Sequence, residues 1–212
     1  MPLTRQQISH PDMGSVVRSL LRQATELNHE RLNRHSLLAG LLQPDYSLAN
    51  YRTLLQALLQ IYHPLELAVL SFLDAHPGVF DYRSRLKTPN LLQDLAFLQS
   101  RGPSMPATPS LPNVAGLGEL VGILYVIEGS TLGGQLIAKS LEKHLGLSHE
   151  QGARFFHGYG EKTAAMWLGF IRFSDGIFGD EQQCRAAKLA ADQTFNRFEA
   201  VLDGYVGGKP GA

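Results

Sequence analysis

Residues 118–141 read GELVGILYVIEGSTLGGQLIAKSL, and five glycines interrupt an otherwise strongly apolar pattern of helical period. Each glycine inside a helix costs roughly 1 kcal/mol relative to alanine, so Gly129, Gly133 and Gly134 together cost about 2–3 kcal/mol. Gly129 and Gly133 are four residues apart and therefore share one face of the helix. Without Cβ atoms they let a flat ligand or another helix approach the backbone. The stretch predicts a helix shaped for a close neighbour and leaves open whether that neighbour is a ligand or protein.

The middle of this stretch also carries groups that suit a bend. The adjacent Gly133 and Gly134 favour bending more than close packing. Ser130 and Thr131 place hydroxyls beside the same opening, where they can bond a carbonyl freed by the bend or a water. A bend lined by hydroxyls is expected here.

The rest of the chain predicts an all-α, single-domain multihelical bundle. Apolar residues recur three and four positions apart, and alternating stretches rich in Val, Ile and Thr are missing. We expect an N-terminal arm over 1–12, a helical domain over 13–206 and a flexible tail over 207–212. The segment GPSMPATPSLPN has a proline at every third position and predicts an extended surface connection. The expected helices are 13–33, 47–76 with a bend or break at Pro64, 83–99, 113–145 capped by Asn113, 148–157, 161–175 and 180–204.

The composition excludes several classes of protein. The chain has 212 residues with 19 basic and 19 acidic side chains, a balance that argues against a nucleic-acid binder. A single cysteine, Cys184, excludes an internal disulfide framework and a zinc cluster built on several thiolates. No apolar run of about 18 residues and no signal-peptide pattern is seen, so we expect a cytoplasmic protein with no membrane partner.

One histidine and one arginine share a face of the first predicted helix. Arg22 precedes His29 by seven residues, which places them about 20° apart around the axis and about 10 Å apart along it. This spacing suits a flat cofactor with a metal at its centre and carboxylates at its rim, because imidazole binds iron and guanidinium binds carboxylates. The alternative is that His29 is a hydrogen-bonded packing residue at the edge of the apolar stripe.

A di-iron centre is a second possibility that the sequence argues against. Glu26 and His29 form the Glu-x-x-His spacing that di-iron bundles use twice. None of the other seven histidines has an acidic residue three positions before it. A second copy of the motif is therefore missing.

Several segments together resemble the heme oxygenase family. LRQATELNHERL (21–32) resembles the stretch that carries the family's proximal histidine, and YVIEGSTLGGQLIAK (125–139) resembles the glycine-bearing distal helix. Ile61-Tyr62-His63 and the aromatic pair Trp167 and Phe170 also have counterparts. The resemblance implies the heme-oxygenase-like fold with His29 as the iron ligand. The heme-binding residues that it implies are Arg22, Thr25, His29, Tyr125, Gly129, Gly133, Gly134 and Arg172, and the catalytic ones are Gly129, Ser130 and Gly133.

The resemblance also implies an activity of the bacterial, biliverdin-producing type. Heme serves as substrate and prosthetic group, and O2 opens the ring to biliverdin, carbon monoxide and ferrous iron. Because no Gly-x-Gly-x-x-Gly fingerprint follows a strand, electrons are expected from a ferredoxin or a flavin reductase. A bilin-binding photoreceptor is a possible acceptor of the product. One departure concerns Ser130, which stands where animal members have a distal aspartate.

Three other functions compete with this expectation. A heme carrier or sensor would bind through His29 without turnover, and a helical interaction module would not bind heme at all. The thiamin-hydrolysing proteins of similar helical architecture are a weaker rival, because they use a cysteine nucleophile and no basic partner marks Cys184.

Overall fold

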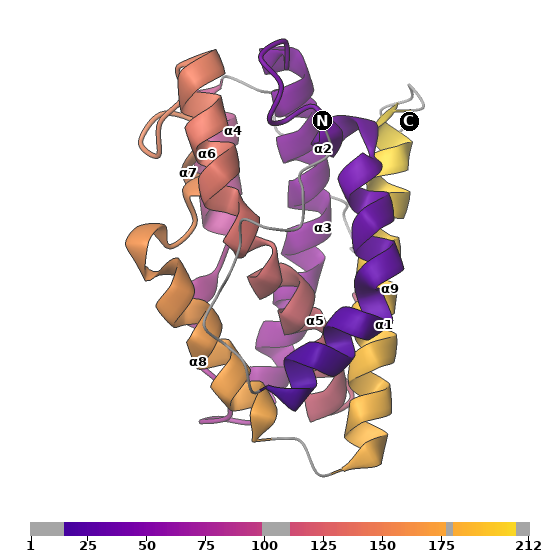
Figure 1. The fold of residues 1–212 in the computed structure, drawn as a ribbon. Coiled ribbons are helices and arrows are strands. Elements are labelled where there is room, and N and C mark those ends of the chain that lie inside the picture. The colour runs from indigo at the N-terminus through magenta and orange to yellow at the C-terminus, as the bar shows by residue number, and fades with distance from the viewer. Residues whose placement is uncertain (1–14, 99–110, 177–179, 207–212) are drawn as a thin grey trace.

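The computed structural model describes residues 15–98, 111–176 and 180–206, and within these ranges it contains helices and no strand (Figure 1). This confirms the all-α prediction. The predicted arm 1–12, the tail 207–212 and most of the proline-rich segment lie outside the described residues. The elements are α1 (Val16–Arg34), α2 (Ser36–Ala39), α3 (Leu48–Ala75), η1 (Arg83–Arg85), α4 (Thr88–Phe97), α5 (Leu117–Gly129), α6 (Thr131–Leu145), α7 (Arg154–His157), η2 (Gly160–Lys162), α8 (Thr163–Asp175) and α9 (Glu181–Val206).

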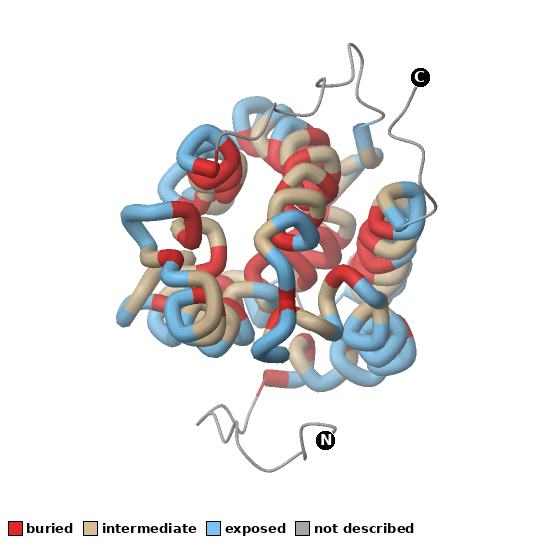
Figure 2. Tube along the Cα trace, turned by 90° about the horizontal axis from the view of Figure 1, so that it is seen from above, coloured by how far each residue is buried: buried red, intermediate tan, exposed pale blue. Residues whose placement is uncertain are grey.

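The helices form two sides around a shared apolar interior. α9 packs along α5 and α1, while α3 packs along α4 and α9. Figure 1 shows α1 beside α9 on one side of the molecule and α6, α7 and α8 on the other. Viewed from above, the buried parts of the helices face one another and the exposed parts form the rim (Figure 2). α3 and α5 therefore supply much of the core.

Of the predicted bend or break at Pro64, the break is wrong. α3 runs without interruption from Leu48 to Ala75 with Pro64 inside it. Proline removes one backbone donor and crowds the preceding turn, at a cost of about 3 kcal/mol. Here the buried side chains extend from Tyr51 to Leu73, on both sides of Pro64. Their burial outweighs that cost.

The predicted helix over 113–145 is two helices that meet at Ser130. α5 begins after Gly116, not at Asn113, and α6 begins at Thr131. The Ser130 hydroxyl donates to the Ile127 carbonyl (2.9 Å), and the Thr131 hydroxyl donates to the Glu128 carbonyl (2.6 Å). The predicted role of these hydroxyls is confirmed, but the interruption lies at Ser130 and not at Gly133 and Gly134.

Two other predicted helices are shorter in the structure, and one of them begins at a cap supplied by a residue far away in the sequence. The predicted helix 83–99 is a 3-10 turn followed by α4, and the predicted helix 148–157 shortens to α7. The Asp94 carboxylate accepts from the backbone N–H groups of Arg154 (2.9 Å) and Phe155 (2.8 Å). A cap supplied from 60 residues away cannot be predicted from the local sequence.

Three glycines of the opening stretch serve close helix packing. A Cβ atom at Gly122 would lie 2.3 Å from the Ala187 carbonyl oxygen of α9, and one at Gly118 would lie 2.5 Å from the Gln183 carbonyl oxygen. A Cβ atom at Gly134 would lie 2.5 Å from the Phe156 carbonyl oxygen. Real Cβ atoms do not approach an oxygen this closely. The prediction that Gly134 serves bending more than packing is therefore wrong.

Two helical stretches, Leu48–Ala75 and Leu117–Leu145, are long and apolar enough to cross a membrane by length and composition alone. The core helix of a soluble protein meets the same criterion, and 67% of the most apolar window of the first stretch is buried inside the fold. These helices are therefore weak indicators of a membrane span.

The packing glycines are expected to tolerate no side chain. We expect Gly122→Ala to lower the free energy of unfolding by about 1–3 kcal/mol, because the added methyl overpacks the contact between α5 and α9. Gly133→Ala, for which no described atom lies within 4 Å of the added Cβ, should raise it by about 0.5–1 kcal/mol. Urea denaturation of both variants checks this. An unchanged stability in Gly122→Ala would contradict the packing role.

Candidate functional site

His29 lies on the exposed surface of α1 and packs against α9. Its ring meets the Phe195 ring edge-on, with centroids 6.3 Å apart. The Asn33 side-chain amide lies 3.1 Å from Nδ1 of His29, which makes Nε2 the nitrogen that can bind a metal. Partial desolvation lowers the pKa of His29, and the Arg22 charge lowers it further against the opposing effect of Glu30. The imidazole is thus held in its neutral, metal-binding form near pH 7.

Thr25 of α1 is hydrogen bonded to Tyr125 of α5, and the charge of Arg22 acts on the same tyrosine. The Thr25 hydroxyl donates to the Leu21 carbonyl (2.8 Å). Burial raises the pKa of Tyr125, while a hydrogen bond with the Thr25 side chain and the charges of Arg18 and Arg22 oppose that rise. Tyr125 also packs against Trp167, with ring centroids 6.1 Å apart. Three of the predicted heme-binding residues therefore share one location with His29, whose pKa also responds to Arg22.

Gly129 and Gly133 differ from the packing glycines. A Cβ atom at Gly129 would meet Trp167 at ordinary contact distances of 3.7 and 3.8 Å. A Cβ atom at Gly133 would have no described atom within 4 Å. The packing of the described residues thus has room for a side chain at both positions. Of the three glycines predicted to serve a ligand, only Gly133 faces open space among the described residues, while Gly129 faces the Trp167 ring at ordinary contact distance.

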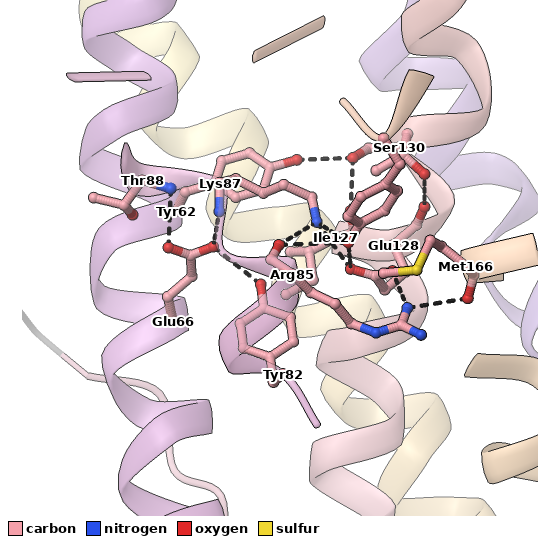
Figure 3. Close-up of polar contacts among 12 residues, drawn as sticks. Tyr62, Glu66, Tyr82, Arg85, Lys87, Thr88, Ile127, Glu128, Ser130 and Met166 are labelled. Carbon is pink, nitrogen blue, oxygen red and sulfur yellow. Dashed lines mark hydrogen bonds and ion pairs between the residues drawn. The ribbon is translucent and has the colours of Figure 1, made fainter. Parts of the chain in front are cut away.

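Ser130 lies at the junction of α5 and α6 and bonds to α3. Its hydroxyl is 2.8 Å from that of Tyr62 (Figure 3). Because Ser130 has one hydroxyl proton and donates it to the Ile127 carbonyl, Tyr62 is the donor in this pair. Tyr62 is buried, and burial raises the pKa of its hydroxyl far above the usual range. One lone pair of the Ser130 oxygen is left to accept a hydrogen bond from a ligand or a water.

Two aromatic side chains of α9 contact the two parts of the candidate site. The Tyr62 ring packs edge-on against Phe198 of α9, with centroids 5.6 Å apart. Phe198 is three residues from Phe195, the ring that touches His29. α9 thus contacts both the predicted iron ligand and the partner of Ser130.

Arg172 is not brought together with the other predicted residues. It is exposed in the last turn of α8. That turn meets the beginning of α1, where the Ser15 hydroxyl donates to Asp175 (2.7 Å). No described contact joins Arg172 to Arg22, Thr25 or His29, so its role stays a prediction.

A buried charge cluster beside Ser130 was not predicted. Glu128 is fully buried and accepts from Arg85 Nη1 (2.6 Å), Lys87 Nζ (3.0 Å) and the Tyr159 hydroxyl (2.8 Å) (Figure 3). Arg85 Nη1 also donates to the Met166 carbonyl (3.0 Å). Burial lowers the pKa of Lys87, although the Glu128 carboxylate opposes this. The signal in the sequence was a carboxylate at the end of the apolar run LVGILYVIEG, which requires a buried partner.

A second buried carboxylate lies near this cluster. Glu66 of α3 accepts from the Tyr82 hydroxyl (3.1 Å) and from the backbone N–H groups of Lys87 (2.5 Å) and Thr88 (3.0 Å). It fixes the segment between η1 and α4 against α3. Glu66 thus holds the Lys87 backbone, and Glu128 holds the Lys87 side chain.

Comparison with known proteins identifies the family. Residues 16–204 match the family model of heme oxygenase. The chain belongs to the heme oxygenase family. It is 36% identical over 87 residues to heme oxygenase PigA of Pseudomonas aeruginosa, and the aligned stretch covers 41% of this chain and 43% of that protein.

Solved heme oxygenase structures share the fold. The heme oxygenase of Neisseria meningitidis, described in NO- and CO-bound forms, gives a TM-score of 0.72 at 23% identity over 92% of this chain and 94% of that one. Heme oxygenase-1 of the cyanobacterium Synechocystis, in complex with heme, gives 0.70 at 18% identity over 90% and 92% of the two chains. The predicted heme-oxygenase-like fold is confirmed.

The residues present fit a heme. Within 15–98, 111–176 and 180–206 no group of three His, Cys, Asp or Glu side chains could hold a metal ion. A metal at His29 would therefore need further ligands that a porphyrin can supply. His29 presents a neutral imidazole, Arg22 lies on the same helix face, and neither Gly129 nor Gly133 is held against neighbouring backbone. This donor set matches a heme better than an ion held by protein alone.

The charge on Arg22 is expected to add to the effect of desolvation in lowering the pKa of His29. In the heme-free protein the pKa of His29 should lie below its usual value and rise in Arg22→Gln, because a neighbouring cation disfavours the imidazolium. Glu30→Gln should lower it further. An NMR titration of the ring protons measures both shifts, and a pKa that does not respond to Arg22→Gln would show that the two residues are not neighbours.

Proposed function

We propose that this heme oxygenase family member converts heme to biliverdin, carbon monoxide and ferrous iron, using O2 and external electrons. The observation that carries the proposal is the division among the glycines of α5 and α6. Gly118, Gly122 and Gly134 are required by neighbouring backbone, whereas Gly129 and Gly133 are not required by any described neighbour. Glycines that cost helix stability without serving packing are expected where a flat ligand approaches.

On the α1 side we assign His29 as the iron ligand through Nε2. The Asn33 amide beside Nδ1 would orient the ring, as partners of metal-bound histidines do. Nδ1 must carry a proton when Nε2 binds iron, so the Asn33 amide would turn its oxygen toward the ring. Arg22 would bind a propionate, and Thr25 and Tyr125 would contact the macrocycle where α1 crosses α5.

On the α5–α6 side we assign Gly129, Ser130 and Gly133 to oxygen chemistry. The two glycines would leave space for O2 above the ring. The Ser130 hydroxyl already gives its proton to Ile127 and accepts one from Tyr62, so it can offer only an acceptor to a water. A carboxylate also offers acceptors, which is why serine can stand where animal members have aspartate. Gly134 packs against Phe156, which argues against its predicted contact with heme.

The reductant is proposed to be a separate protein of the ferredoxin or flavin-reductase class. The sequence has no strand followed by a dinucleotide-binding glycine motif, which supports this assignment. Heme would supply the redox chemistry when it is bound. The chain would bind the heme, orient it and shield it from water. A cytoplasmic location and a bilin-binding photoreceptor as product acceptor complete the proposal.

A heme carrier with the same fold is the alternative. The observation that favours it is Ser130, an exposed hydroxyl in place of an acid. A carrier would not need Gly133 to lie open at the cost of a helical glycine, which favours turnover.

Reaction of the hemin-reconstituted protein with a ferredoxin and its reductase under air tests this function. We expect the Soret band to disappear and a biliverdin absorption to replace it. His29→Ala should lose the iron–imidazole spectrum and the bilin product, while the exposed His149→Ala should behave as wild type. A persistent Soret band without bilin would establish a carrier, and the absence of a stoichiometric change with hemin would refute heme binding.

Gly129 and Gly133 should be needed for the reaction, although alanine at either position is compatible with the fold. We expect Gly129→Ala and Gly133→Ala to reduce the rate of bilin formation by about tenfold or more, equivalent to about 1.4 kcal/mol, because each methyl enters the space beside the ring. Gly204→Ala is the matched control, since its Cβ also meets no described atom but lies on α9. Equal rates in all three variants would contradict the assignment.

A further inference from the structure

The buried charge cluster around Glu128 is costly for the protein. Glu128, Glu66, Lys87 and Arg85 are 0–7% exposed. Removing each charge from water costs several kcal/mol, and a buried ion pair commonly stabilises a fold no better than apolar residues would. The cluster is therefore poorly explained by stability alone.

All three side chains that bind Glu128 come from outside its helix. Arg85 and Lys87 belong to the segment between α3 and α4, and Tyr159 belongs to the link between α7 and α8. Through the Met166 carbonyl, Arg85 also reaches α8. A single carboxylate thus fixes the last turn of α5 against several parts of the chain (Figure 3).

Gly129, the residue after Glu128, has no side chain that could hold its backbone in place. The chain beyond it leaves α5 at Ser130. Its neighbours hold it from both sides, because the Glu128 carbonyl accepts from the Thr131 hydroxyl and the Ser130 hydroxyl bonds Tyr62. Glu128 is the only one of these anchors that is charged and fully buried.

We propose that Glu128 is a positioning residue: the carboxylate held by Arg85, Lys87 and Tyr159 sets the position of the Gly129–Ser130 backbone. That position decides which edge of a bound macrocycle is presented to oxygen, so Glu128 determines the bilin isomer. The inference rests on the proposed function of the same site. It adds to that function a residue that acts through the backbone of its neighbours.

Glu66 provides a matched control. It is as deeply buried as Glu128 and also accepts three hydrogen bonds. Its partners lie on Tyr82, Lys87 and Thr88, so it fixes the start of α4 and not the end of α5. Glu66→Gln and Glu128→Gln each remove one buried carboxylate, but only Glu128→Gln takes the counter-charge from Arg85 and Lys87 and should loosen the junction of α5 and α6.

The first measurement uses heme-free protein and hydrogen exchange. In Glu128→Gln the backbone amides of residues 129–135 should exchange at least about tenfold faster than in wild type, because the junction opens more readily. Glu66→Gln should leave their rates within about twofold of wild type. Tyr159→Phe removes the hydroxyl that donates to Glu128 and accepts from Lys87 Nζ but leaves both ion pairs, so it serves if Glu128→Gln does not fold, with a smaller change in the same direction.

The second measurement uses the hemin-loaded proteins. Wild type and Glu66→Gln should give the same bilin isomers, whereas Glu128→Gln should give a mixture of isomers and a broadened C–O stretch in the ferrous CO complex. Wild-type exchange and isomers in a folded Glu128→Gln variant, or equal changes in Glu66→Gln, would overturn the inference. Failure of wild type to form any bilin would instead refute the proposed function, and the exchange rates would still decide whether Glu128 holds the junction.

Discussion

The buried carboxylate of Glu128 is the constraint on which the arrangement of the helices around the site depends. A charge without contact with water must be matched inside the fold, and here Arg85 and Lys87 supply that match at 2.6 and 3.0 Å. These contacts bring the segment between α3 and α4 against the end of α5. The helix then stops where its carbonyls can be satisfied by the hydroxyls of Ser130 and Thr131. The buried charge and the partly exposed hydroxyls thus lie next to each other at the end of α5.

The glycines of residues 118–141 serve two different purposes, close packing at some positions and open space at another. Toward α9, Gly118 and Gly122 are small because the neighbouring backbone is too close for any side chain. Beyond the junction, Gly133 is small although the described chain leaves room. α5 is therefore packed tightly against α9, whereas the surface of α6 at Gly133 is not covered by described residues. Since a rigid anchor is needed for an open surface to keep its shape, the packing glycines support the site indirectly.

Sequence periodicity predicted most of the helices, because their apolar faces are local patterns. It failed where distant partners decide the outcome: Asp94 sets the start of α7, and burial on both sides carries α3 through Pro64. In the site, the shared face of Arg22 and His29 was predictable from spacing on one helix. The cluster around Glu128 was not, because its cations lie 43 and 41 residues away and only folding brings them together.

Because the chain has equal numbers of basic and acidic side chains, its net charge does not help to bind an anionic ligand at the proposed site. Inside the fold, Arg85 and Lys87 are balanced by Glu128 and Glu66, so this cluster adds no net charge beneath the junction. An anionic macrocycle must then be held by individual cations such as Arg22. The same guanidinium lowers the pKa of His29, which keeps the imidazole neutral before the ring arrives. If Arg22 binds a propionate and His29 binds iron as proposed, that effect would weaken and the imidazole would become a stronger donor to iron. Binding at the rim of the macrocycle would thus strengthen ligation at its centre.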